Sequence, residues 1–69
     1  MTFKEGDEVR LRVNVTRDGG VGVVPAGTVG VVVDDVHAPG QYAVDVEVDG
    51  EPDNVAVGGE QIELVAATA

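Results

Sequence analysis

Hydrophobic residues recur at every second position in two segments of this chain, and most of them are valines. The first segment contains Val9, Leu11, Val13 and Val15, and the second contains Tyr42, Val44, Val46 and Val48. The positions between them are mostly polar or charged. Because successive side chains of an extended strand point to opposite faces, a period of two predicts strands with one buried face. Both segments are therefore predicted to be half-buried β-strands.

The intervening segment, residues 28–36, has a different pattern because it is apolar on both faces. Val29, Val31 and Val33 would share one face, and Val32 would lie on the other. This pattern predicts a central or strongly bent strand that is covered on both sides. Gly30 within it predicts a bulge or a barrel corner, where a side chain would obstruct the close approach of two backbones.

Turn signals and shorter apolar runs complete the predicted sheet. Two further strands are expected at residues 54–57 and 62–65, separated by a tight turn or a single 3₁₀ turn at 58–61. Asp49-Gly50 predicts a hairpin, since glycine readily adopts the positive φ of a tight turn. A second turn at 18–20 lies at the tip of a long first loop ending at 25–27, and residues 13–15 and 21–23 would extend this loop into a twisted ribbon. Helical periodicity with caps is absent, so little or no helix is expected.

These elements predict one all-β domain over residues 1–65, followed by a frayed tail at 66–69. Five short antiparallel strands favour a closed or nearly closed barrel, because closure removes exposed strand edges. The alternative is an open five-stranded sheet that is completed by strand exchange with a second copy. A chain of 69 residues without cysteine has a small core and can supplement it with neither disulfides nor thiolate metal sites.

Three short motifs carry a resemblance to known proteins. Residues 3–11 (FKEGDEVRL) look like the x-G-D-x-V-x-L start of many small five-stranded barrels of the SH3-like superfamily. Residues 25–32 (PAGTVGVV) resemble the G-x-x-G-x-V turn of KOW-type modules and of PsaE-like barrels, and residues 59–65 (GEQIELV) resemble their x-x-L-E-x-V finish. The resemblance implies the fold much more than a function, because each motif is structural.

The charge is strongly negative and unevenly distributed. The net charge is −9, and the four basic residues all lie in the first 17 positions: Lys4, Arg10, Arg12 and Arg17. From residue 18 onward there are ten acidic residues and no basic one. Such a surface repels phosphate, which disfavours nucleic acid as a partner. The interpretation is a non-enzymatic protein-interaction or structural module that serves as an accessory subunit, a homo-oligomer or a part of a larger assembly such as a virus particle.

Two candidate protein-binding surfaces follow from these patterns. The first is the long loop, with Arg17, Asp18, Val21 and Val23. The second is an acidic stripe of Asp45, Glu47 and Asp49, whose carboxylates would lie about 7 Å apart on the outer face of one strand. The stripe suits a solvated face, a docking face for a basic protein or a cation site. Arg10 and Arg12 are expected to pair with Glu63 and Asp34 instead, which would leave the stripe open.

The sequence gives little indication of a catalytic, metal-binding, peptide-binding or cofactor site. His37 is expected in an exposed turn, where Asp34 and Asp35 could supply metal or catalytic partners but a surface-loop histidine is favoured. The chain contains no serine. The only aromatic residues are Phe3 and Tyr42, which are too few for the aromatic groove that binds Pro-rich peptides. No cofactor is expected, and neither a signal peptide nor a membrane span is recognisable, which favours a soluble cytoplasmic protein. The alternative functions are a KOW-like nucleic-acid module that uses Arg10, Arg12 and Arg17, a weak divalent-cation-binding domain, and a nucleic-acid mimic.

Overall fold

The computed structural model describes residues 2–17, 22–38 and 40–67, with the side chains of residues 35–38 outside this description. Its elements are seven strands and one short 3₁₀ helix, η1. In chain order they are β1 (Glu8–Leu11), β2 (Val15–Thr16), β3 (Val23–Val24), β4 (Val29–Ala38), β5 (Gln41–Val48), β6 (Glu51–Gly58), η1 (Gly59–Gln61) and β7 (Ile62–Ala66). The expected all-β class and the 3₁₀ turn before the last strand are confirmed.

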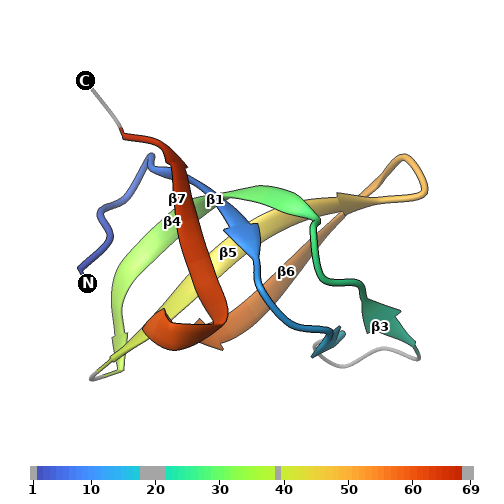
Figure 1. The fold of residues 1–69 in the computed structure, drawn as a ribbon, viewed down its shortest axis with the longest axis horizontal. Helices are drawn as coiled ribbons and strands as arrows, with labels where there is room; N and C mark the ends of the chain where they lie inside the picture. The colour runs from blue at the N-terminus through green and yellow to red at the C-terminus, as the bar shows by residue number, and fades with distance from the viewer. Residues whose placement is uncertain (1, 18–21, 39, 68–69) are drawn as a thin grey trace.

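Five of the strands form one antiparallel sheet in the order β6-β5-β4-β1-β7, and β2 and β3 form a separate two-stranded hairpin. In Figure 1 the long strand β4 is curved, and β1 and β7 lie in front of β5 and β6. The sheet thus folds back over its own apolar face. Strands β6 and β7 are its two edges, so the sheet is not closed.

The apolar face of the folded sheet forms the core. The cluster consists of Phe3, Val9, Leu11, Val15, Val24, Val32, Tyr42, Val44, Val46, Val55, Val57 and Ile62. The rings of Phe3 and Tyr42 meet edge to face at 5.4 Å, and the Tyr42 hydroxyl accepts a hydrogen bond from the Phe3 backbone amide at 3.3 Å. Both predicted alternating segments contribute their inward residues to this core.

The first strand is shorter than predicted. β1 ends at Leu11, and Val13 is exposed rather than buried. The Leu11 amide donates to the Thr28 carbonyl, and its carbonyl accepts from the Gly27 amide, so the contact between β1 and the chain before β4 extends to Leu11. The chain then bends at residues 12–13. Of the ribbon expected from residues 13–15 and 21–23, the structure shows Val15 paired with Val24 and Thr16 with Val23. The turn expected at 18–20 and Val21 lie outside the described residues.

Close backbone contact explains Gly30, but no bulge lies there. Gly30 pairs regularly with Val9 on one side and Val46 on the other, and a Cβ built on it would lie 2.3 Å from the Asp45 carbonyl oxygen. The register of β4 against β5 shifts later, between Val32 and Asp34 and again before Ala38. Strand β4 continues to Ala38, so the expectation of a turn at His37 is wrong for the backbone.

The β5–β6 hairpin confirms the Asp49-Gly50 turn. Val48 pairs with Glu51, and both turn residues have positive φ, 52° at Asp49 and 80° at Gly50. These values are those of a two-residue type I′ hairpin turn. Strand β6 begins three residues earlier than predicted, at Glu51, because this tight turn brings the polar residues into register with β5. Pro52 is tolerated because β6 is an edge strand.

The two ends of the chain pack onto the sheet through short polar contacts. Asp7 is buried, and its carboxylate accepts a hydrogen bond from the Lys4 amide at 2.9 Å across a turn in which Gly6 has a φ of 94°. At the other end β7 reaches Ala66, which pairs with Glu8, so the strand includes the first residue of the expected tail.

Candidate protein-binding face

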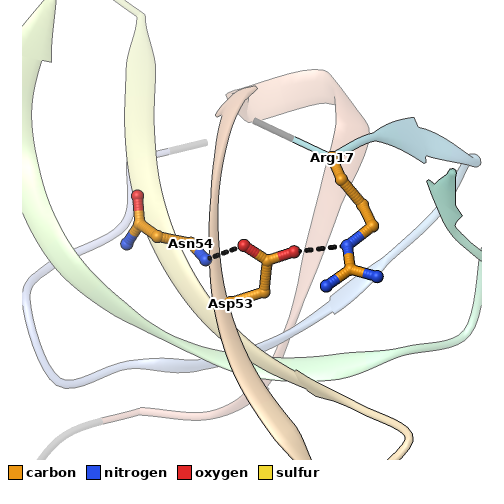
Figure 2. Close-up of polar contacts among 3 residues, drawn as sticks. All are labelled: Arg17, Asp53 and Asn54. Carbon is orange, nitrogen blue, oxygen red and sulfur yellow. Dashed lines mark hydrogen bonds and ion pairs between the residues drawn. The ribbon is translucent and has the colours of Figure 1, made fainter. Parts of the chain in front are cut away.

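Arg17, in the first candidate surface, is engaged within the fold. Its Nε lies 2.6 Å from Oδ2 of Asp53 on β6 (Figure 2). Both side chains are largely covered. Val23 on β3 is exposed, whereas Asp18 and Val21 lie outside the described residues. The pair Arg17–Asp53 links the β2–β3 hairpin to the edge of the sheet. Sequence patterns miss it, because 36 positions separate the two residues and no local spacing connects them.

Asp53 is held in its charged form by this arrangement. The hydrogen bond from Arg17 and a second one from the Asn54 backbone amide, at 2.9 Å, lower the pKa of Asp53 below its ordinary value of 3.8. Asp53 lies directly opposite the buried Val46, so it extends the core-facing side of the hairpin. The ion pair thus closes one end of the core.

The acidic stripe lies on the opposite face of the same hairpin. Asp45 and Glu47 are exposed on β5, and Asp49 follows the strand in the turn. Asp45 accepts a hydrogen bond from the Asn54 side chain at 2.9 Å, and Glu47 pairs with Pro52. Arg17 of the first predicted surface therefore contacts the inner side of the β5–β6 ribbon, whereas the acidic stripe lies on its outer side.

The outward valines of β4 are exposed, which corrects the expectation of a strand covered on both sides. Val29, Val31 and Val33 retain 40%, 42% and 39% of their accessible surface. Val32, on the inner face, is fully buried. In this domain one face of β4 therefore supplies the core and the other leaves a ridge of valines at the surface.

Two of these valines, Val29 and Val31, and two residues of the stripe, Asp45 and Glu47, line one groove. Cross-strand pairing aligns Glu8, Val31 and Asp45 in a single row across β1, β4 and β5. In the next row Val29 is opposite Arg10, and Glu47 is opposite Pro52. The groove has a volume of about 290 Å³ and is lined by Glu8, Val29, Gly30, Val31, Asp45, Val46, Glu47 and Pro52. We refer to it as the outer groove.

The charges of the outer groove are not neutralised by the two ion pairs of the described chain. Those pairs are Arg17–Asp53 and Arg10–Glu63, the latter at 3.9 Å. The expected pairing of Arg10 with Glu63 is confirmed, and it directs Arg10 toward β7. The groove thus has an apolar floor and a rim of three carboxylates, from Glu8, Asp45 and Glu47. The sequence pointed to the stripe but missed Glu8 and Pro52, which only the strand register brings beside it.

A second hollow has mixed charge. It has a volume of about 440 Å³, and its lining includes Arg12, Glu60 and Glu63, together with Phe3 and Tyr42. Arg17 lies elsewhere, on the segment after β2, and contacts β6. Of the three arginines of the predicted basic patch, Arg10 and Arg17 each pair with a carboxylate, and Arg12 shares this hollow with two glutamates.

Among the described residues, no three His, Asp or Glu side chains are grouped so that they could hold a metal ion. The same part of the chain contains no helix that is long and apolar enough to cross a membrane. No protein-family model matches the chain, and no curated protein or solved structure matches it. Its function is therefore inferred from its own geometry.

Proposed function

We propose that this chain is a small, acidic, non-enzymatic protein-interaction module with an SH3-like barrel fold, and that it acts as an accessory subunit of a larger assembly. The fold part of the proposal is supported by the strand order, in which the first strand lies between β4 and the last strand. It is also supported by the 3₁₀ helix that leads into that last strand. The motifs at residues 3–11, 25–32 and 59–65 fall at the expected places in this order.

The single observation that carries the functional part is the exposed row of valines on β4. Val29, Val31 and Val33 each keep about two fifths of their surface exposed, although most of the valines on the opposite side of the sheet are buried. An apolar patch with a polar rim is a common mark of protein–protein contact sites. A domain with a small core gains stability when a partner covers such a patch.

Affinity capture with matched variants tests this function. The immobilised domain and its Val31→Lys and Val13→Lys variants are exposed to an extract of the source cell, and native mass spectrometry records the oligomeric state. We expect a protein that is captured by the wild type, retained by Val13→Lys and lost by Val31→Lys. Val13→Lys is the matched control because Val13 is as exposed as Val31 and does not line the outer groove. A strict monomer that captures no protein would contradict the proposal.

The placement of the arginines counts against the nucleic-acid alternative. Arg10 and Arg17 each pair with a carboxylate, and Arg12 lines a hollow that Glu60 and Glu63 also line. Phosphate binding by Arg10 and Arg17 would therefore require their two ion pairs to break, in a molecule with a net charge of −9. A gel shift at about 50 mM salt separates the two functions, because even three phosphate contacts give a salt-sensitive complex.

A further inference from the structure

The outer groove has the chemistry to recognise one class of partner. We propose that it docks a basic, extended segment of a protein partner, in which arginine or lysine side chains alternate with apolar ones. This inference rests on the proposed function and names the partner chemistry for it. Two independent features support it: a hollow with exposed valines at its base, and carboxylates on its rim.

The floor of the groove provides the apolar contact. Val29 and Val31 are two residues apart on β4, so their side chains point outward side by side, about 7 Å apart. Gly30 between them contributes only backbone, because its position faces inward against Val46. The ring of Pro52 borders the groove on the β6 side. A bound side chain can therefore pack between the two valines without meeting another side chain at Gly30.

The rim determines the charge of the occupant. Glu8 borders the groove on the β1 side, and Asp45 and Glu47 border it on the β5 side. Asn54 occupies one oxygen of Asp45, and the two ion pairs of the described chain use neither Glu8 nor Glu47. A cationic side chain entering the groove would lie between carboxylates on both sides. Arginine and lysine fit both features, because their aliphatic stems cover apolar surface while their charged ends remain at the rim.

The same charges disfavour the other candidates for this surface. A second copy of the chain would bring its own three rim carboxylates and a net charge of −9 against the first. Nucleic acids and anionic membranes are repelled for the same reason. A basic segment is attracted at long range by the net charge and at short range by the rim. Charge complementarity therefore selects a basic protein segment.

Fluorescence anisotropy with a defined peptide tests the inference. The probe is a short fluorescein-labelled peptide of alternating arginine and leucine, and its counterpart carries glutamate in place of arginine. We expect the arginine peptide to bind and the glutamate peptide not to bind. Raising salt from about 50 to about 500 mM should weaken the complex, because ions screen exposed charge pairs.

Matched variants locate the binding site. Glu47→Gln and Val31→Thr should each lower the affinity about two- to fivefold, the range expected for one exposed contact. Glu60→Gln removes the same charge outside the outer groove and should leave the affinity unchanged. Equal losses in Glu47→Gln and Glu60→Gln would overturn the inference, as would equal binding of the two peptides or no binding of the arginine peptide.

The outcomes separate this inference from the function on which it rests. A partner captured in a Val31-dependent way, together with no binding of the arginine peptide, would retain the interaction module and reject the basic ligand. Groove-dependent binding of the peptide, together with a monomer that captures no partner, would support the groove chemistry and reject the accessory role.

Discussion

The acidic residues on the two faces of the β5–β6 hairpin lie in different environments. On the inner face, Asp53 continues the line of the buried residues and is held by Arg17 at 2.6 Å. On the outer face, Asp45 and Glu47 are exposed, and their cross-strand neighbours are an asparagine and a proline. The inner carboxylate closes the core, whereas the outer ones border a groove.

This difference shows that charge alone does not identify a functional surface. Both faces carry carboxylates within a few residues of one another, but only the inner one has a basic partner that the fold brings to it. An acidic residue with a structural partner contributes to stability. One beside exposed valines is available to a ligand.

Val44 and Asp45 are adjacent on β5 but lie on opposite faces, so the substitutions Val44→Asp and Asp45→Val should change stability very differently. Val44→Asp places an unpaired charge among fully buried valines, at a cost of about 4 kcal/mol or more. This is comparable to the whole stability of a domain of this size, roughly 3–10 kcal/mol, so the variant should be unfolded. Asp45→Val should remain folded with stability within about 1 kcal/mol of the wild type, because the position is exposed. Circular dichroism and urea unfolding measure both, and equal losses would remove the distinction between the faces.

Gly30→Ala tests the close approach of β4 and β5. The added Cβ would lie 2.3 Å from the Asp45 carbonyl oxygen and 2.8 Å from the nearest methyl groups of Val44 and Val46. We expect a loss of about 1–3 kcal/mol, the range for overpacking a well-filled core.

Gly58→Ala is the matched control for Gly30→Ala. The three atoms nearest to a Cβ at Gly58 all belong to the side chain of Glu60, which can rotate away, and the backbone there is extended. Urea midpoints should therefore fall clearly for Gly30→Ala and little for Gly58→Ala. A similar fall in both would show that glycine flexibility, and not the approach of the strands, determines the effect.

Removing the Arg17–Asp53 contact should have a smaller, pH-dependent effect. Because the pKa of Asp53 is lowered in the folded state, its contribution to stability is fully present above the ordinary value of 3.8. The contribution is lost as the pH falls through the lowered folded-state pKa. Arg17→Gln should therefore be less stable than the wild type at neutral pH, and the difference should shrink below pH 3.8. Urea midpoints across this range measure it, and a difference that grows in acid would contradict the role of the pair.

The outer carboxylates should have the smallest effect on stability. Glu47→Gln removes one negative charge from an exposed position in a chain of net charge −9. We expect a change within about 0.5 kcal/mol and in the stabilising direction, because like-charge repulsion decreases. Thermal unfolding at low salt measures it, and a clear loss of stability would mean that Glu47 has a structural partner.

Strand patterns predicted the parts of the fold that depend on local periodicity. The alternation over residues 42–48 and the Asp49-Gly50 pair predicted β5 and its turn. The burial predicted for Val13 is wrong, because β1 ends at Leu11 and the chain bends at residues 12–13. Hydrophobic periodicity continues through this bend and does not predict it.

The candidate site was predictable only in part for the same reason. The acidic stripe follows from spacing within one strand, but Glu8 and Pro52 join it through the registers of β1 with β4 and of β5 with β6. The sequence of β4 showed that Val29 and Val31 form a second apolar face on this strand. It did not indicate that this face would remain exposed, because its burial depends on elements that are distant in sequence.

Binding of a basic segment in the outer groove is tested most directly by NMR, with the ¹⁵N-labelled domain titrated with the arginine–leucine peptide. The largest changes in chemical shift should fall on the amides of Glu8, Val29, Val31, Asp45 and Glu47, around the outer groove. Amides of the β2–β3 hairpin and of the hollow beside η1 should change little. Changes concentrated on the hairpin or that hollow, or spread evenly over the acidic surface, would contradict binding in the outer groove.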